Sequence, residues 1–441
     1  MKKKLSGFPE YLPGERIIEQ QVLASLQHTF ELHGFGSIET RAVESMESLT
    51  RKGEIDKEVY VVQRLHAPEG SQAELGLHFD LTVPFARYVL EYAGHLEFPF
   101  RRYQIQKAWR GERPQEGRYR EFLQADVDIV GQGELAAHHD VELPLVTLDA
   151  LERLHTDFGI PPVTMRVNNR KLSEGFYRGL GVADPMAVLQ RVDKLDKFGP
   201  EAVRQSLADD LGMSAVAIDA CLQLASIKTD DTAFVAQVRA LGVTHELLDT
   251  GLAELAAVIE QVAAEVPGRI VADLSVARGL DYYTGTVYET SMAGLESLGS
   301  ISSGGRYDSL ATEGKNTYPG VGLSIGVSRI LYPLLGKGVL VPSRIVPTCV
   351  LVAVDAEETR TASNQLAARL RARGIPTEVS PDAAKYGKQI KYADRRGIPY
   401  VWFGDSVKDI RSGEQVSADP DSWEPSPADW WPIPIRKDES A

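Results

Sequence analysis

The spacing of hydrophobic positions changes from helical to strand-like within the first third of the chain. From Glu15 to His33 apolar residues recur every three or four positions and Gly34 follows, which predicts an amphipathic helix ending there. The next segments are rich in β-branched and aromatic residues and are broken by Gly and Pro, which predicts strands over residues 36–43, 59–65, 76–79, 98–109 and 120–130. Successive strands without alternating helices favour an antiparallel sheet, and therefore an α+β fold rather than a doubly wound one.

Residues 170–265 have helical periodicity instead, and we expect an all-helical insertion there. The apolar positions predict helices over residues 202–211, 215–225, 232–241 and 244–266. Strand-like segments return at residues 270–274, 282–290 and 299–303, and residues 322–335 indicate a strand that runs into a helix. We therefore expect one domain over residues 1–335, whose sheet is completed after the insertion.

A second, smaller domain is predicted near the C-terminus. Residues 336–348 contain two Gly and two Pro, which is typical of a linker. Beyond them the pattern alternates between strands and helices, which predicts a mostly parallel α/β sheet within residues 347–436. The expected strands are 350–354, 377–379 and 400–403, and the expected helices are 362–373 and 384–396. The Trp-containing tail after Ser417 gives no structural prediction.

The composition is that of an ordinary soluble protein with room for two or three domains. The chain has 441 residues, of which 43% are hydrophobic and 25% charged. No segment approaches the roughly 18 apolar residues that span a membrane, so we expect a cytoplasmic protein without membrane association. Cys221 and Cys349 lie far apart and are expected to be buried as small hydrophobic residues. His138 and His139 are adjacent but lack an H-E-x-x-H pattern, so no built-in metal site is expected.

The net charge of −14 argues against a simple nucleic-acid binder, but the basic residues are clustered. Residues 101–120 contain seven Arg or Lys against two Glu, and residues 385–396 contain five basic residues against one acidic. A polyanion is therefore expected to bind at these two places.

The first of these clusters lies in a predicted hairpin. Residues 100–109 and 120–128 flank a polar loop with Gly111, Pro114 and Gly117. Strand alternation places a cation and three polar side chains on one face, namely Arg110, Gln124, Asp126 and Asp128. Such a face suits a zwitterionic ligand, because guanidinium groups bind carboxylates or phosphates in a bidentate manner. The alternative is a solvated hairpin with weak surface ion pairs.

Two later stretches combine small residues with Tyr and Arg. In residues 277–289, alternation predicts Tyr283, Gly285 and Val287 on one side of a strand and Tyr282, Thr284 and Thr286 on the other. A glycine inside a strand often marks close approach of a ligand, although a tyrosine-rich core strand is equally consistent. Residues 302–308 and 319–330 lead to Arg329 near a helix start, where a planar ligand could lie beneath a guanidinium. A glycine-rich packing strand is the alternative there.

In this order the three stretches resemble the class II aminoacyl-tRNA synthetases. The hairpin is similar to their motif 2, and residues 322–330 to their motif 3. More specifically, Arg278-Gly-Leu-Asp-Tyr-Tyr-Thr-Gly resembles the histidine-specific signature of histidyl-tRNA synthetases, and Ser303-Gly-Gly-Arg-Tyr-Asp and Phe79-Asp-Leu-Thr-Val-Pro-Phe-Ala-Arg also match that family. The resemblance covers nearly the whole chain, including the helical insertion (170–265) and an anticodon-binding domain (347–436).

This resemblance implies that histidine is activated with ATP and transferred to tRNA(His). The α-amino group of L-histidine is then expected at Asp80, Thr82 and Gln124, and the imidazole at Asp128 and Tyr283. Tyr282 and Arg278 are also expected to bind histidine. Arg110 and Arg278 are the expected catalytic residues, because they would bracket the histidine carboxylate and the α-phosphate of ATP. The implied ATP site consists of Arg110, Glu112, Arg118, Phe122, Arg278 and Arg329. Mg²⁺ is expected to arrive with ATP and not in a protein cage of its own.

The implied tRNA contacts lie in both basic clusters. Arg113 and Gln115 are expected near the acceptor end, and phosphate contacts are expected from Lys385, Lys388, Lys391 and Arg395. A solvated helix face is the alternative for the second group. The family also implies a homodimer, although Arg41 stands where class II motif 1 usually has a proline.

Two other functions are consistent with the same fold. One is a non-catalytic synthetase paralogue, such as the regulatory subunit of ATP phosphoribosyltransferase, and the other is a tRNA-binding interaction protein. Paralogues of the first kind lack the anticodon domain and tend to lose ATP-binding arginines, whereas Arg110, Arg118, Arg278 and Arg329 are all present here.

Overall fold

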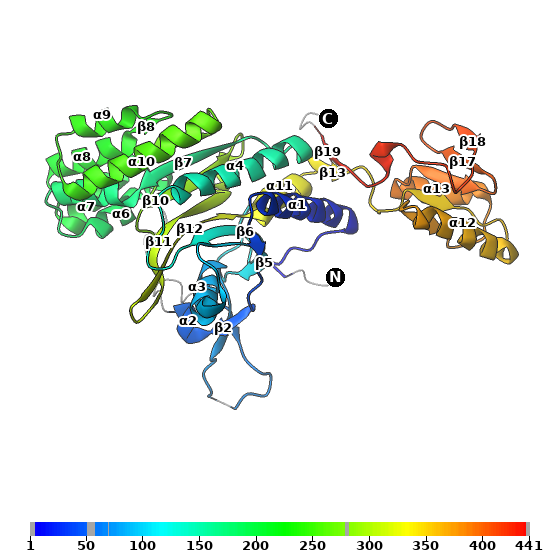
Figure 1. The fold of residues 1–441 in the computed structure, drawn as a ribbon, viewed down its shortest axis with the longest axis horizontal. Helices are drawn as coiled ribbons and strands as arrows, with labels where there is room; N and C mark the ends of the chain where they lie inside the picture. Colours follow the sequence, from blue (N-terminus) through cyan, green and yellow to red (C-terminus); the bar gives the residue numbers. More distant parts are fainter. Residues whose placement is uncertain (1–4, 51–57, 69, 278–281, 438–441) are drawn as a thin grey trace. The chain divides into compact units, whose positions relative to one another are not determined.

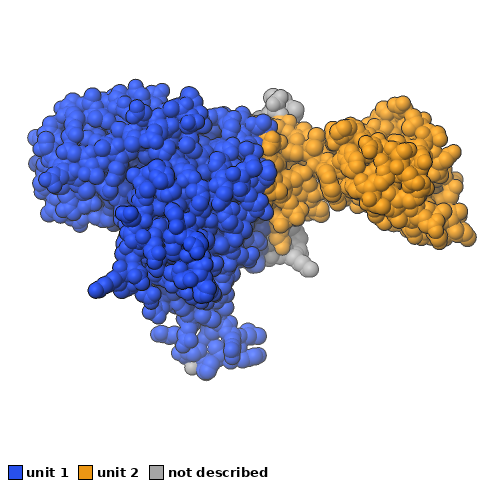
Figure 2. All heavy atoms as spheres, viewed as in Figure 1, with its two compact units in different colours: residues 1–9, 25–156, 160–333 blue, residues 10–24, 157–159, 334–441 orange. Residues whose placement is uncertain are grey.

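The computed structural model describes residues 5–50, 58–68, 70–277 and 282–437, which form two compact units (Figure 2). Unit 1 comprises Met1–Pro9, Ser25–Thr156 and Ile160–Pro333, and unit 2 comprises Glu10–Ala24, Asp157–Gly159 and Leu334–Ala441. Helix α1 (Pro13–Leu32) contributes residues to both. No helix of the described ranges is long and apolar enough to cross a membrane.

Unit 1 is built on a nine-stranded sheet in the order β1-β5-β6-β12-β11-β10-β7-β9-β8 (Figure 1). Its pairs are antiparallel except β1 with β5 and β7 with β9, which are parallel. The strands are β1 (Gly36–Ser37), β5 (Phe100–Trp109), β6 (Glu121–Val130), β7 (Val163–Asn169), β8 (Lys228–Thr229), β9 (Ile270–Asp273), β10 (Thr286–Met292), β11 (Ser302–Glu313) and β12 (Asn316–Ile325). This antiparallel-rich sheet confirms the predicted α+β class.

Helices cover the two faces of the sheet differently. On one face lie α4 (His139–Phe158), whose Asp140 receives hydrogen bonds from Arg306, and α10 (Glu246–Glu265), which packs against β7 and β9. On the other face α3 (Thr82–Tyr92) packs against β11, with Phe85 and Val89 in a buried cluster with Val130. A three-stranded sheet has the order β2 (Val43–Ser45), β4 (Leu75–Leu77) and β3 (Val61–Val62). Helix α2 (Met46–Thr50) packs against β2 and β4 of this sheet and also against α3.

Residues 170–265 are mostly helical, but they also contain the short strand β8 of the large sheet, which the expected all-helical insertion did not include. The helices are α5 (Arg170–Gly179), α6 (Pro185–Val192), α7 (Leu195–Leu211), α8 (Ala215–Ser226), α9 (Ala233–Ala240) and α10. Helices α5 and α10 pack closely because each presents a glycine to the backbone of the other, Gly175 from α5 and Gly251 from α10. A Cβ at Gly251 would lie 2.1 Å from the Leu172 nitrogen, so any larger residue would force the helices apart.

Unit 2 contains a five-stranded sheet in the order β15-β14-β16-β17-β18. The strands are β14 (Val350–Val352), β15 (Thr377–Val379), β16 (Tyr400–Phe403), β17 (Ser406–Asp409) and β18 (Gln415–Ser417), and the helices are α12 (Arg360–Ala372) and α13 (Tyr386–Arg396). The first three strands are parallel, as predicted, and β17 and β18 add an antiparallel edge that the sequence pattern did not reveal. Strand β13 (Leu340–Pro342) follows α11 (Val327–Gly336) along the chain. It pairs with β19 (Pro434–Arg436), the last strand of the described chain.

Two local expectations were wrong, and one segment without a prediction is structured. Residues 36–43 form two short strands in different sheets, because the Gln104 and Gln106 side-chain amides bind Thr40 and the chain leaves the edge of β5 there. Strand β10 begins at Thr286, so residues 282–285 precede it. The tail after Ser417 is structured, since Trp423 and Trp430 pack against the core of unit 2.

Candidate active site

The face of the large sheet on the α3 side has a floor of very small residues next to a row of polar ones. Asp128 on β6 pairs with Arg102 on β5 and Gly322 on β12, and Gly322 pairs in turn with Gly305 on β11. Two positions along, the corresponding residues are Gln104, Asp126, Ser324 and Ser303. Since paired residues share a face, the glycines and serines leave space beside the carboxylates.

Asp128 is held by two partners in a fully enclosed position. Its Oδ1 accepts a hydrogen bond of 2.7 Å from the Tyr307 hydroxyl, and its Oδ2 lies 2.8 Å from Nη2 of Arg102. The Arg102 guanidinium also lies 4.0 Å from the centre of the Phe85 ring and is completely buried. Burial raises the pKa of Asp128, and the charge of Arg102 opposes this shift.

Tyr282 and Tyr283 lie together over this face, not on opposite sides of a strand. Their hydroxyl oxygens are 3.2 Å apart, because both residues precede the first residue of β10. Asp128 and Tyr307 act electrostatically on Tyr283, whereas Tyr282 is influenced by Asp80, Arg110 and Asp126. Burial raises the pKa of both phenols, so both are neutral hydrogen-bonding groups at physiological pH.

Asp80 and Thr82 approach the site from the start of α3. The Asp80 carboxylate accepts a hydrogen bond of 3.0 Å from the Val83 backbone N–H, which fixes the carboxylate at the first turn of the helix. Its charge influences both Asp126 and Asp128. The structure therefore brings Asp80 into the neighbourhood of the carboxylates on β6, with Thr82 as the first residue of α3.

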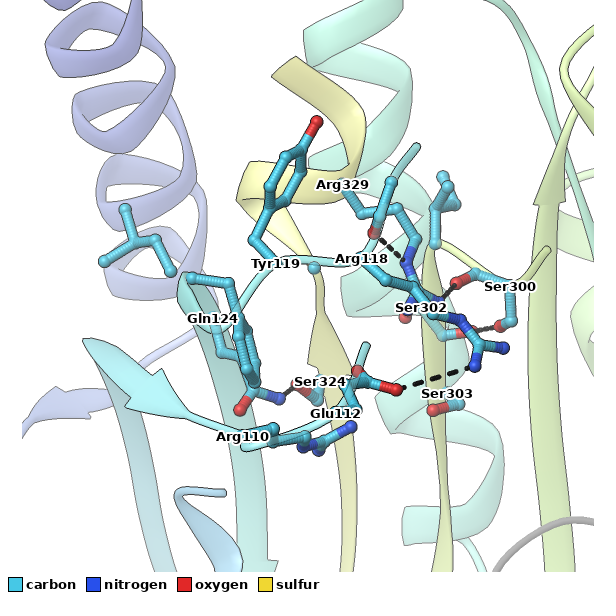
Figure 3. Close-up of a pocket in the computed structure, with 15 residues that line it drawn as sticks. Arg110, Glu112, Arg118, Tyr119, Gln124, Ser300, Ser302, Ser303, Ser324 and Arg329 are labelled. Atoms are coloured by element: carbon cyan, nitrogen blue, oxygen red, sulfur yellow. Dashed lines mark hydrogen bonds and ion pairs between the residues drawn. The ribbon is translucent and has the colours of Figure 1, made fainter. Parts of the chain in front are cut away.

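A pocket adjoins this face and is lined by the hairpin, β12 and the start of α11 (Figure 3). It brings together six residues expected from the sequence, namely Arg110, Glu112, Arg118, Phe122, Gln124 and Arg329. The remaining lining includes Ser302, Ser303 and Ser324, which lie in the stretches singled out in the sequence, and also Tyr119 and Ser300, which the sequence did not single out. Arg278 lies outside the described residues.

The arginines of the pocket are positioned by backbone carbonyls and by one carboxylate. Arg110 donates from Nε to the Phe79 carbonyl at 3.0 Å, and its guanidinium lies 5.1 Å from the Phe122 ring centre. Arg329 donates from Nε to the Gly117 carbonyl at 2.9 Å, which ties α11 to the hairpin loop. Arg118 lies 3.7 Å from Glu112 and is otherwise exposed (Figure 3). Three guanidinium groups thus surround one pocket, which suits a polyphosphate.

The residues expected to bind tRNA are exposed in both units. Arg113 and Gln115 lie in the hairpin loop of unit 1, where the backbones of Gln115 and Arg118 bond to each other. In unit 2, Lys388, Lys391 and Arg395 line an open cavity of about 750 Å³ along α13. Lys385 is exposed at the residue before α13 but does not line this cavity.

Sequence reasoning missed Arg102, Tyr307 and the part played by Asp126. Alternation did place Asp126 on the polar face, but it gave no reason to treat it differently from Asp128. Arg102 and Tyr307 could not be found in this way, because their contacts with Asp128 depend on the pairing register of β5 and on the position of β11 relative to β6.

Two features singled out in the sequence, Arg41 and the His138–His139 pair, make structural contacts. Arg41 binds Glu44, which is buried and also receives two hydrogen bonds from Arg87. Among the described residues, His138, His139 and Glu142 form a group with ligand atoms within 4.8 Å of one another. Both carboxylate oxygens of Glu142 are already engaged, by His139 at 2.8 Å and by Arg101 at 2.6 Å, so these contacts join α4 to β5.

Comparison with known proteins identifies the family of the chain. A family model described as histidyl-tRNA synthetase matches residues 7–330, and an anticodon-binding-domain model matches residues 348–416. The chain is 64% identical to a histidine–tRNA ligase of Cutibacterium acnes and 57% identical to one of Micrococcus luteus, with 98% and 99% of each chain covered. A solved histidyl-tRNA synthetase from Nostoc sp. PCC 7120 is 33% identical, has a TM-score of 0.84, and is covered over 97% of its length by 96% of this chain. The chain therefore belongs to the histidyl-tRNA synthetase family.

Proposed function

We propose that this site performs both steps of histidine–tRNA ligation. In the first step the carboxylate of L-histidine attacks the α-phosphorus of ATP, forming histidyl-adenylate and releasing pyrophosphate. In the second step a hydroxyl of the terminal ribose of tRNA(His) attacks the acyl carbon, and AMP and a proton are released. The observation that carries the proposal is the continuity of the two halves of the site, because Gln124 lines the arginine pocket and lies on the same strand face as Asp126 and Asp128.

The carboxylate-lined face is proposed to bind histidine. Asp128 and Tyr283 would recognise the imidazole ring, and Tyr282 would pack beside them. A buried acceptor and a neutral phenol discriminate strongly against ligands of similar shape that cannot form the same hydrogen bonds, because the buried groups would then be unpaired. Asp80, Thr82 and Gln124 are proposed to receive the α-amino group.

The arginine pocket is proposed to bind ATP. Arg110, with Arg278, would stabilise the negative charge that develops at the α-phosphate, and both are our proposed catalytic residues. Arg118 and Arg329 would hold the outer phosphates, and Phe122 would contact the adenine. Glu112 is the one carboxylate among the described residues that line the pocket, so it is suited to Mg²⁺ that arrives bound to the phosphates of ATP.

The tRNA and a second copy of the chain complete the proposed assembly. Arg113 and Gln115 would contact the acceptor end, and Lys385, Lys388, Lys391 and Arg395 would contact phosphates near the anticodon. A homodimer that acts in the cytoplasm is proposed from the family. The oligomeric state can be measured by light scattering during size-exclusion chromatography.

The alternative of a non-catalytic paralogue is not favoured. Relatives with 57–64% identity over nearly the whole chain are histidine–tRNA ligases, and the described arginines of the ATP pocket are in place.

Histidine-dependent exchange of radioactive pyrophosphate into ATP tests the proposal directly. We expect exchange with the wild-type protein and a loss of at least about 100-fold in kcat/KM for Arg110→Ala, the size typical of removing one electrostatic donor. Arg153→Ala is the matched control, because Arg153 lies on α4 and its ion pair with Asp149 on the same helix is partly exposed to solvent. Wild-type protein that binds tRNA but shows no exchange would contradict the enzymatic proposal.

A further inference from the structure

The side chain of Asp126 is buried on the floor of the site, and one of its oxygens has no hydrogen-bond partner among the described residues. The residue is 2% exposed and lies in the middle of β6, between Gln104 on β5 and Ser324 on β12. Its Oδ1 has no hydrogen-bond partner among the residues that the structure describes. The same is true of Oε1 of Gln124, two residues earlier on the same strand face. Buried acceptors without donors are rare in proteins, and a pair of them at a ligand site indicates groups that the ligand satisfies.

The neighbouring carboxylate, Asp128, does not have this property. Both of its oxygens are engaged, one by the hydroxyl of Tyr307 and the other by the guanidinium of Arg102. Arg102 acts electrostatically on both carboxyl groups, but its ion pair is with Asp128. Asp126 is therefore the buried carboxyl group that has no ion-pair partner of its own among the described residues.

A positively charged hydrogen-bond donor is the group that best satisfies a buried carboxylate such as that of Asp126. An ammonium group has three N–H donors and no acceptor, so it matches a free carboxylate oxygen next to a free amide oxygen. Histidine carries one such group. We propose that Asp126 binds the α-ammonium group of histidine, with Gln124 as the second acceptor. The assignment rests on the proposed function, and it adds a contact to the three residues named above for this group.

Proton exchange should accompany this contact. Burial raises the pKa of Asp126 to about 7, with Asp128 and Asp80 acting in the same direction and Arg102 and Ser324 opposing them. Among the described residues, Tyr282, before β10, is a further titratable group that interacts with Asp126. Near pH 7 the Asp126 side chain is thus partly protonated when no ligand is bound. A bound ammonium group stabilises the deprotonated carboxylate, so the proton is released. Histidine binding should therefore release roughly half a proton per site at pH 7, and less at pH 8.

The experiment compares Asp126→Asn with wild type in the pyrophosphate exchange assay. We expect the KM for histidine to increase at least 10-fold and the KM for ATP to change less than about 2-fold. The second probe is 3-(imidazol-4-yl)propanoate, which lacks the amino group. Its inhibition constant should be the same for both proteins, because the ligand has nothing for Asp126 to bind. Asp149→Asn, an exchange at a half-buried surface carboxylate on α4, is the matched control.

The outcomes separate this proposal from the proposed function. Absence of exchange in the wild type contradicts the proposed function itself. An active wild type with an unchanged histidine KM in Asp126→Asn overturns the assignment of Asp126. Equal weakening of histidine and of the deaminated analogue would instead place Asp126 at the imidazole and also overturn it. Proton release, measured with an indicator dye in weakly buffered solution, should disappear in Asp126→Asn and persist in Asp149→Asn, which a purely structural role would not produce.

Discussion

Gly322 lies directly beside the carboxylate of Asp128. A Cβ built on this glycine would fall 1.9 Å from Oδ1 of Asp128, the same oxygen that accepts the Tyr307 hydrogen bond. No side chain can occupy that position unless the carboxylate moves. The glycine is therefore needed for the geometry of the carboxylate and not for the conformation of its own backbone.

The first prediction follows from this contact. Gly322→Ala should displace the Asp128 carboxylate and lower kcat/KM for histidine at least 10-fold, with a loss of about 1–3 kcal/mol in unfolding free energy from overpacking. Steady-state pyrophosphate exchange and urea denaturation measure the two effects. Gly94→Ala is the control, since nothing lies within 4 Å of a Cβ there. Equal kinetics for the two variants would show that the site tolerates the added methyl group.

The second prediction concerns the buried charge of Arg102. Arg102→Met should lower the unfolding free energy by about 3–5 kcal/mol at pH 8, because it leaves Asp128 as an unpaired buried charge. Combining it with Asp128→Asn should cost less than the sum of the two single changes, since the second change removes the uncompensated charge. Urea denaturation of all four proteins in the cycle measures this coupling. Strict additivity would show that the 2.8 Å contact has little energetic weight.

The third prediction uses the pKa of Asp126. The folded protein holds this proton up to about pH 7, whereas the unfolded chain releases it near pH 4. Unfolding therefore releases a proton between these values, and the contribution of Asp126 to stability decreases as the pH rises through this window. Without histidine, Asp126→Asn should melt at a higher temperature than wild type at pH 8, and this advantage should shrink at pH 5. A difference in melting temperature that is independent of pH would contradict the raised pKa.

The fourth prediction concerns α13. If Lys388 and Lys391 contact phosphates, replacing both with Ala should reduce the slope of log Kd against log salt concentration by about 2 for tRNA(His). Pyrophosphate exchange does not require tRNA and should be unchanged. Lys408→Ala, on β17 of the same unit, provides the control. An unchanged salt slope would favour the simpler interpretation that these lysines form a solvated helix face.

The sequence predicted those parts of the fold that are encoded by local periodicity. The helices of the insertion, the hairpin of β5 and β6 and the parallel strands of unit 2 have strong patterns of their own. The Arg102–Asp128 pair, in contrast, depends on the register of β5 against β6, which no single segment reveals. The prediction for Tyr282 and Tyr283 was wrong for a related reason, because alternation applies only where a strand exists and β10 starts after both residues.

The tail shows a different limit of local reasoning. Trp423 and Trp430 have no periodic neighbours, so their pattern predicted nothing. They pack against a core that contains Trp402, Tyr400 and other residues far from the tail in the sequence.

The order of strands in the large sheet has a consequence during synthesis of the protein. Ser324 on β12 hydrogen-bonds to Gln124 on β6 but follows it by 200 residues. At about 5–20 residues per second, the ribosome needs roughly 10–40 seconds to deliver this neighbour. For that time the growing chain carries β6 with one unpaired edge, the kind of edge that recruits other chains. The nascent polypeptide therefore exposes this strand edge while the segment between β6 and β12, including the helical insertion, is being translated, and a chaperone that shields the edge would act in that interval.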